Sequence, residues 1–319
     1  MKELEEAIKK RSLVKRGDKV LLGVSGGPDS MALLLSFAAL KKKMGLVLYV
    51  AHVDHNLRRD SGKDAAFVES WAKKLGIPFT CLKLSWRAGK KKGSLEEACR
   101  NARMDFFIRT ALKLKAGKVA LGHNLDDQAE TVLMRLLRGA GLSGLSGIAF
   151  KRTIRGVTFI RPFLAVSRKR IEAFLKRRNI SPRIDSTNLE DVFMRNRIRH
   201  RLIPLLKKEY NRNISGVLSS LAENASSDYD YLERAAAQAA KGGKLAFDTK
   251  KLMRMHPSIL RMNMRQCIAR LKGDTRRITF RHIMELEDLV TSRPPGSIVD
   301  LPQGVSARKN ASSIRFYKR

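Results

Sequence analysis

The sequence predicts an α/β protein with a doubly wound, mostly parallel sheet, followed by a smaller, mainly helical α+β domain. Three observations support this prediction. Short apolar runs alternate with segments of helical composition, the apolar runs are continuous, and the alternation stops after about Leu206. Continuous apolar strands are typical of a parallel sheet covered on both faces. We expect a first domain over residues 1–212 and a second over residues 213–319.

Each element of the first domain follows from local composition. The predicted strands are the apolar runs at residues 19–25, 46–53, 79–84 and 118–122. The predicted helices lie between and after them, at residues 31–40, 61–75, 94–114 and 126–138. In the second helix Phe67, Val68 and Trp71 recur at helical spacing, and in the third Ser94 and Glu97 have the spacing of a capping box.

The second domain shows no such alternation. Residues 211–238 are predicted as one or two helices that end before the break at Lys241-Gly242-Gly243-Lys244. Further helices are predicted at residues 252–271 and 282–290. Two short strands, at residues 297–301 and 312–317, would form a hairpin around Gly304.

The charge of the chain is strongly positive. Its 319 residues carry 65 Lys and Arg against 30 Asp and Glu, a net charge of +35. This excess, present in both predicted domains, argues against a generic small-molecule enzyme and favours a polyanion, either nucleic acid or an anionic membrane. Only 6% of residues are aromatic, so stacking recognition of single strands is not indicated.

Targeting and cysteine signals are weak. No apolar run is long enough to cross a bilayer, and the acidic N-terminus lacks the apolar segment of a signal peptide. Cys81, Cys99 and Cys267 have neither metal-site nor disulfide spacing. We therefore expect a cytoplasmic protein with no membrane partner; its oligomeric state, a homodimer included, stays open.

The most informative segment follows the first predicted strand and reads Ser25-Gly26-Gly27-Pro28-Asp29-Ser30. The glycines permit a sharp turn, Pro28 suits a first helical turn, and the serine hydroxyls and helix N-terminus favour an anion. Asp29 would repel phosphate unless a cation lay between them, which makes it a candidate Mg²⁺ ligand. The alternative is a simple strand-to-helix turn.

Two further segments end at the same edge of the predicted sheet. At the end of the second strand, the backbone of Ala51 and His52 is expected to reach adenine, whereas a metal site at His52 and His55 is poorly supported. After the fourth strand come His123 and the acids Asp126, Asp127 and Glu130. Acids in a first helical turn commonly complement the helix dipole, but a histidine beside them favours a site for Mg²⁺ or a cationic substrate.

A GxGxxG pattern at residues 139–144 follows a predicted helix, so it does not fit a dinucleotide-binding turn. Gly139 is better explained as a helix stop, and the segment through Gly147 as a flexible loop near the site, able to act as a lid.

The loop at residues 25–30 resembles the SGGxDS fingerprint of the PP-loop ATP pyrophosphatase superfamily, whose fold is adenine nucleotide alpha-hydrolase-like. Several further segments together resemble the tRNA(Ile)-lysidine synthetase family: residues 51–58, 97–103, 122–131, 185–188, 195–199, 203–204 and 301–304. The resemblance covers nearly the whole chain. Members usually carry a further C-terminal domain, so we expect a short form.

The resemblance implies a ligase that forms a carbon–nitrogen bond, with residues 1–212 as its catalytic domain and residues 213–319 as a small tRNA-binding domain. ATP would adenylate the carbon-2 oxygen of the wobble cytidine in the CAU anticodon of tRNA(Ile), releasing pyrophosphate. The amine of free lysine would then attack carbon 2 and expel AMP, giving lysidine.

The implied roles distribute over the residues already described. ATP would contact residues 25–30 with Ala51 and His52, and Mg²⁺ would contact Asp29 and Asp127. Lysine would be bound or deprotonated by Asp127 and Glu130, with Asp126 as a third acid. Phosphate charge in the transition state would be offset by Arg103 or His123.

A dense basic stretch at residues 195–201 is the candidate tRNA contact, through Arg195, Arg197 and Arg199. Their spacing spreads them around a helix, so Arg195 and Arg199, which share one side, are preferred. The alternative is a solvated helix face.

Two other functions are weighed against lysidine synthesis. A cytidine or uridine thiolase of the same superfamily would ordinarily need paired cysteines or an iron–sulfur cluster, which the cysteine spacing does not offer. A non-enzymatic RNA-binding protein would explain the charge but not the loop.

Overall fold

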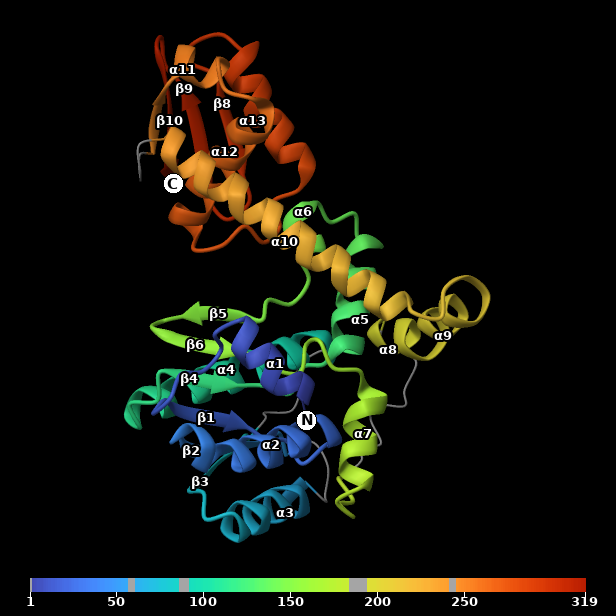
Figure 1. Ribbon diagram of the computed structural model, residues 1–319. Helices are drawn as coiled ribbons and strands as arrows, with labels where there is room; N and C mark the ends of the chain where they lie inside the picture. The colour runs from blue at the N-terminus through green and yellow to red at the C-terminus, as the bar shows by residue number, and fades with distance from the viewer. Residues whose placement is uncertain (1, 57–60, 86–91, 184–193, 241–244) are drawn as a thin grey trace. The chain divides into compact units, whose positions relative to one another are not determined.

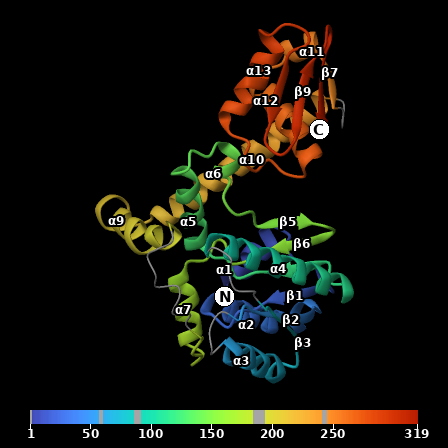
Figure 2. The same cartoon turned by 180° about the vertical axis from the view of Figure 1, so that it is seen from behind.

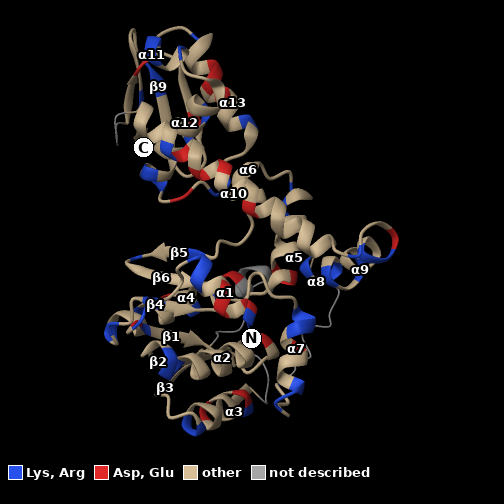
Figure 3. Cartoon of the chain, in the orientation of Figure 1, with Lys and Arg blue, Asp and Glu red and all other residues tan. Residues whose placement is uncertain are grey.

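The computed structural model describes residues 2–56, 61–85, 92–183, 194–240 and 245–319. It divides into two compact units, Met1–Asn224 and Ala225–Arg319 (Figures 1 and 2). Lys and Arg occur over both units (Figure 3). No helix in the described ranges is both long enough and apolar enough to cross a membrane.

The N-terminal unit is built on a six-stranded sheet of order β3-β2-β1-β4-β6-β5. All neighbouring strands are parallel except the β5–β6 pair. The strands are β1 (Lys19–Gly23), β2 (Val47–Asp54), β3 (Phe79–Lys83), β4 (Lys118–Ala120), β5 (Lys151–Ile154) and β6 (Val157–Ile160). The predicted mostly parallel sheet is confirmed.

Helices cover both faces of this sheet, which explains the continuous apolar strands. Val20 and Leu22 of β1 pack in one core with α2, whereas Leu21 packs in a second core with α4. The helices of this part are α1 (Lys2–Lys10), α2 (Pro28–Met44), α3 (Ser61–Lys74), α4 (Lys92–Lys113), α5 (Leu125–Leu136), α6 (Leu142–Leu145) and α7 (Arg168–Lys176).

A further helical segment completes the N-terminal unit. It comprises α8 (Met194–Arg197), the π-helical turn η2 (Ile198–Leu202), α9 (Ile203–Leu205), a second π-helical turn η3 (Leu206–Tyr210) and the start of α10 (Ile214–Ala239). Leu218 and Ala222 of α10 share a core with Val132 and Leu133 of α5. This burial explains why the first unit extends to Asn224, beyond the predicted boundary at residue 212.

The C-terminal unit has a four-stranded sheet of order β7-β10-β9-β8, packed against helices. Its elements after α10 are β7 (Ala246–Asp248), α11 (Thr249–Met253), α12 (Pro257–Lys272), α13 (Phe280–Thr291), β8 (Ile298–Leu301), β9 (Val305–Lys309) and β10 (Ser313–Lys318). The α+β character is confirmed, and Gly304 does turn a hairpin, between β8 and β9.

Three details differ from the expectations. The helix expected at residues 252–271 is two helices, because Pro257 begins α12 and His256 caps it. The hairpin partner β9 was missed, since the expectation placed its strand at residues 312–317. The β5–β6 hairpin was also missed, although Arg155 and Gly156, with φ of 48° and 80°, form a two-residue left-handed turn.

Candidate active site

The site lies where the strand order reverses, at the carboxyl ends of β1 and β4. In open parallel sheets this is where ligands bind, because the connections leave in opposite directions and open a crevice. The segment between β1 and α2 and the segment between β4 and α5 are therefore neighbours. Asn124 Nδ2 donates to Asp29 Oδ1 at 2.8 Å and joins the two directly.

The loop before α2 is held by its own serines. The Ser25 N–H donates to Ser30 Oγ at 3.1 Å, and Ser30 Oγ donates to the Gly27 carbonyl at 3.0 Å. Gly26 has φ of 90°, which only glycine adopts without strain. Gly27 is the helix N-cap, without a capping side chain, and Pro28 follows in the first turn. The first N–H groups of α2 are therefore left for an anion.

Ala51 and His52 lie inside β2 and form the foundation of this loop. The Ala51 carbonyl accepts from the Val24 N–H at 2.9 Å, and buried His52 donates from Nδ1 to the Val24 carbonyl at 2.8 Å. Because β2 continues to Asp54, the backbone of both residues belongs to the sheet ladder. Their predicted contact with adenine stays a prediction.

Asp29 is a half-buried carboxylate at the start of α2. Burial raises its pKa to about 6, the hydrogen bond from Asn124 opposes this rise, and the nearby charge of Asp127 adds to it. A cation beside Asp29 would favour the ionised form. The residue thus fits the predicted Mg²⁺ ligand, as Mg²⁺ is commonly held by one or two carboxylates and substrate phosphates.

Gly122 is where the segment after β4 comes closest to the loop. A Cβ there would lie 3.0 Å from the Asp29 carbonyl carbon and 3.1 Å from the Ser30 nitrogen. Because these are backbone atoms, Gly122→Ala is expected to displace the start of α2 and to weaken ATP binding on the order of tenfold. Calorimetric titration with ATP measures this.

Gly117→Ala is the matched control. Gly117 lies just before β4, whereas Gly122 lies just after it, and a Cβ at Gly117 would meet nothing within 4 Å. Equal ATP affinity of Gly122→Ala and Gly117→Ala would contradict the close approach of Gly122 to the start of α2.

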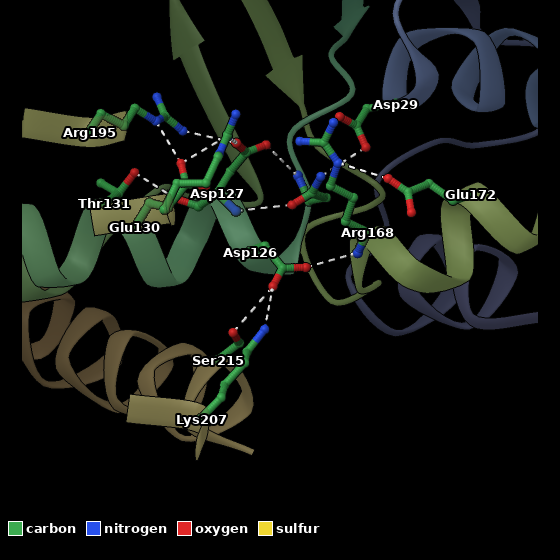
Figure 4. A network of polar contacts seen from close by, with 12 residues as sticks. Asp29, Asp126, Asp127, Glu130, Thr131, Arg168, Glu172, Arg195, Lys207 and Ser215 are labelled. Atoms are coloured by element: carbon green, nitrogen blue, oxygen red, sulfur yellow. Dashed lines mark hydrogen bonds and ion pairs between the residues drawn. The ribbon is translucent and has the colours of Figure 1, made fainter. Parts of the chain in front are cut away.

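Asp127 and Glu130 lie on one face of α5 and bind two arginines (Figure 4). Arg195 Nε donates to Glu130 Oε2 at 2.8 Å, and its Nη2 donates to Asp127 Oδ1 at 2.9 Å. Arg199 Nε donates to Glu130 Oε1 at 2.5 Å, and its Nη2 to Asp127 Oδ1 at 3.2 Å. Burial disfavours charge on Arg199, but Glu130 and Asp127 outweigh it and raise its pKa.

These contacts give Arg195 and Arg199 partners inside the protein. The two do share one helical side, as the spacing predicts, but that side faces α5 carboxylates. Arg197 is exposed instead. The carboxylates are also occupied: Asp127 Oδ2 accepts the Asn124 N–H at 3.0 Å, within a reciprocal capping box at the start of α5.

Asp126 points away from Asp127 and Glu130 (Figure 4). Its Oδ2 accepts the Arg168 N–H at 2.9 Å, and its Oδ1 accepts from Lys207 Nζ at 3.2 Å and Ser215 Oγ at 3.3 Å. It therefore ties α5 to α7 and to the start of α10. This arrangement gives Asp126 a structural role, and the predicted contact with lysine is unsupported by its surroundings.

His123 and Arg103 lie among other positively charged side chains. Burial lowers the pKa of His123 to about 3, and the positive charges of Arg161, Arg195, Arg103 and Arg100 add to this. His123 is therefore neutral near pH 7, and its buried Nδ1 has no hydrogen-bond partner within the described ranges. Burial also lowers the pKa of Arg103, with Arg100 contributing. Of the two, only Arg103 would carry charge to a phosphate.

The sequence prediction missed two residues of this site. Asn124 both caps α5 and binds Asp29, and its position three residues before Asp127 is a capping signal that would have found it. Arg168 acts through its backbone N–H on Asp126, which no local pattern indicates.

The loop predicted as a lid is held in place. Arg135 Nη1 donates to the carbonyls of Gly144 and Gly147 at 2.9 and 2.7 Å. Gln128 exchanges two hydrogen bonds with Ile148, at 3.1 and 2.6 Å. Gly139 follows α5, as expected of a helix stop, with φ of 70°.

Two predicted features are limited by what the structure describes. Arg58 and residues 185–188, which contributed to the family resemblance, lie outside the described residues. Within the described ranges, no group of three or more His, Cys, Asp or Glu side chains forms a metal site. The predicted Mg²⁺ contacts of Asp29 and Asp127 stay a prediction.

A parallel sheet with an anion-binding loop after its first strand and acids at the switch point defines an ATP-using domain of the PP-loop class. The family model described as "PP-loop domain" matches residues 1–206. The U34-tRNA thiolase NcsA from Methanococcus maripaludis has a similar fold, with a TM-score of 0.56 and 21% identity, over 70% of this chain and 78% of that one.

More specific similarity comes from curated relatives. A tRNA(Ile)-lysidine synthase from Clostridioides difficile is 36% identical over 96% of this chain and 68% of its own length. The enzymes of Clostridium tetani and Geobacillus kaustophilus are 36% and 35% identical, over 97% and 98% of this chain and 67% and 68% of theirs. The chain belongs to the tRNA(Ile)-lysidine synthase family.

Proposed function

We propose that this chain joins lysine to carbon 2 of the wobble cytidine in tRNA(Ile) with a CAU anticodon, in the cytoplasm. The observation that carries the proposal is the contact between Asn124 and Asp29. This contact joins the loop before α2 to the start of α5 and supports a shared site in a chain of this family. Fold similarity to a thiolase at 21% identity does not favour sulfur transfer.

The first step is adenylation. The carbon-2 oxygen of cytidine attacks the α-phosphorus of ATP, and pyrophosphate leaves. The loop at residues 25–30 binds the departing phosphates through the free N–H groups of α2 and the serine hydroxyls. Mg²⁺, held by Asp29 and Asp127, would supply positive charge to these phosphates. Arg103 binds the α-phosphate, and neutral His123 donates one hydrogen bond to it.

The second step is attack by lysine. Its amine, after losing a proton, attacks carbon 2, and AMP leaves with the former carbon-2 oxygen. Asp127 and Glu130 receive the ammonium group or the proton. Because Arg195 and Arg199 occupy both carboxylates, the ammonium group must displace them. The displaced arginines would then face RNA phosphates, which agrees with their predicted tRNA contact; exposed Arg197 and the C-terminal unit would add further contacts.

Incubation of the protein with ATP, labelled lysine and CAU-anticodon tRNA tests the proposal. We expect lysine to be retained in the tRNA, with AMP and pyrophosphate released in equal amounts. A transcript with uridine at the wobble position is the control and should retain none. Sulfur incorporation, or tRNA binding without any lysine transfer, would overturn the proposal.

The raised pKa of Asp29 predicts a pH dependence of nucleotide binding. Because Mg²⁺ needs the ionised carboxylate, affinity for ATP with Mg²⁺ should increase between about pH 5 and 7, with a midpoint near the pKa of about 6. Calorimetric titration measures this, and the profile without Mg²⁺ should be flatter.

The raised pKa of Asp29 also makes the stability of the fold depend on pH, in the direction opposite to that of nucleotide binding. Since the folded pKa of about 6 exceeds the ordinary value of 3.8, the stabilisation by the Asp29 proton is complete below about pH 4. It is lost as pH rises through about 6. Asp29→Asn should remove both dependences, and a variant that kept them would place the titrating group elsewhere.

A further inference from the structure

Five arginines gather on one side of the N-terminal unit, and we call them the arginine cluster. They come from α4, the end of α5, β5 and the residue after β6: Arg100, Arg103, Arg135, Arg152 and Arg161. Arg135 and Arg161 donate to the same loop, to Gly147 at 2.7 Å and Ala149 at 2.8 Å. The β5–β6 register pairs Arg152 with Phe159, which brings it beside Arg161.

The charges of the cluster are not neutralised by any carboxylate that the structure describes. None of its five members forms an ion pair in that part of the chain. Arg161 is 9% exposed, and its buried Nε has no hydrogen-bond partner among the described residues. Burial, followed by the charges of Arg152 and Arg100, lowers the pKa of Arg161 to about 10.

For Arg161, the buried member of the cluster, such an arrangement is costly without an anion. Buried charges are ordinarily paired, and removing one partner from a buried pair is strongly destabilising. The nearby carboxylate of Asp105 pairs with Arg155, outside the cluster, at 2.7 Å. Among the described residues, a carboxylate thus pairs with a neighbouring surface arginine and none pairs with the cluster, as expected where a ligand supplies the negative charge.

We propose that the arginine cluster binds a backbone phosphate of RNA next to the reacting cytidine. This rests on the proposed function, which places the cytidine beside His123 and Arg103. The charges that act on His123 come from Arg161, Arg103 and Arg100 of the cluster, together with Arg195. The charges that act on Asp29, at the nucleotide loop, come instead from Arg168 and Arg199. Apart from Arg103, which the proposed function assigns to the α-phosphate, the cluster thus consists of arginines other than those that act on the nucleotide loop, and the planar arginine fork suits a phosphodiester.

Arg152→Gln and Arg100→Gln test the proposal, because both side chains are exposed and neither is assigned to the reaction. Each variant should weaken binding of a CAU anticodon stem-loop about tenfold. Each should also reduce the slope of log affinity against log salt by about one. ATP affinity should not change. Arg177, the exposed C-cap of α7, provides the control. Arg177→Gln should change neither the affinity for the stem-loop nor its salt dependence.

A second measurement locates the phosphate. Stem-loops that carry a single neutral methylphosphonate linkage, moved one position at a time through the anticodon, are titrated with the unaltered protein and with Arg152→Gln. One linkage next to the wobble nucleotide should weaken binding by the unaltered protein and have no effect on the variant.

The outcomes separate the possible ligands. Loss of ATP affinity with unchanged RNA affinity would assign the cluster to the nucleotide and overturn the proposal. Unchanged affinity for both ATP and RNA would also overturn it. So would the absence of any methylphosphonate linkage that weakens binding by the unaltered protein but not by Arg152→Gln. Since RNA binding needs no turnover, a chain that made no lysidine but gave the expected linkage result would retain the cluster and refute the proposed reaction.

Discussion

Glu130→Ala is expected to lower the free energy of unfolding of the N-terminal unit by about 3 kcal/mol and lysine incorporation by about 10²–10⁴-fold. Glu130 is 1% exposed and accepts from both Arg195 and Arg199. Removal of the Glu130 carboxylate leaves the guanidinium groups of Arg195 and Arg199 with Asp127 as their remaining partner among the described carboxylates. Thermal or denaturant unfolding and a lysine-incorporation assay measure the two effects.

A second variant separates charge from shape. Glu130→Gln keeps hydrogen-bond acceptance, so it should lose less stability than the alanine variant and still lose lysine incorporation. ATP–pyrophosphate exchange, which reports the first step, should be affected less than incorporation. The control is Glu172→Ala, whose exposed pair with Arg168 contributes at most about 0.5 kcal/mol. Full incorporation by Glu130→Gln would remove this carboxylate from the reaction.

Asp126→Ala is expected to lower the free energy of unfolding by about 2 kcal/mol, because three hydrogen bonds end on this carboxylate. In a unit of this size that corresponds to a fall in melting temperature of roughly 4–8 °C. The KM for lysine should be unchanged, since Asp126 points to α7 and α10 and away from the other acids (Figure 4).

The pH dependence of this contribution has a defined sign. Burial tends to raise the pKa of Asp126, but the Arg168 N–H and the Lys207 ammonium outweigh it, so the pKa is lowered. The stabilisation is present above the ordinary value of 3.8 and is lost as pH falls through the lower folded pKa. Asp126→Asn should therefore be less sensitive to acid. A raised KM for lysine in this variant would instead support the direct contact that the sequence predicts.

Local patterns were sufficient for the elements around the loop. The apolar run from Lys19 predicts β1, and Gly26 and Pro28 predict the turn into α2, because strand burial and turn geometry depend on adjacent residues. The β5–β6 hairpin was harder to recognise. Its exposed β5 lacks the apolar run that marks a strand, although Gly156 gives a turn signal. An edge strand is stabilised by pairing more than by its own composition.

The sequence likewise predicted the candidate acids as a group, but it did not predict which side chain each acid contacts. Asp126, Asp127 and Glu130 are close in sequence, so a shared helix follows directly. Which of them face Arg195 and Arg199, and which faces Lys207, depends on how α5 packs against residues some 65 to 81 positions later. Helical spacing predicts which arginines share a side but does not identify what that side contacts.

The sequence by itself determined the parallel α/β class, the glycine-containing turn at residues 25–30 and the basic charge of +35, because each arises from local order or composition. Only the tertiary structure decided that Asn124 joins Asp29 to α5, that Arg195 and Arg199 pair with acids, and that the arginine cluster forms no ion pair with a carboxylate among the described residues. The physical reason is that ion pairs and burial depend on distances between segments remote in the chain. Those distances are set by sheet order and helix packing.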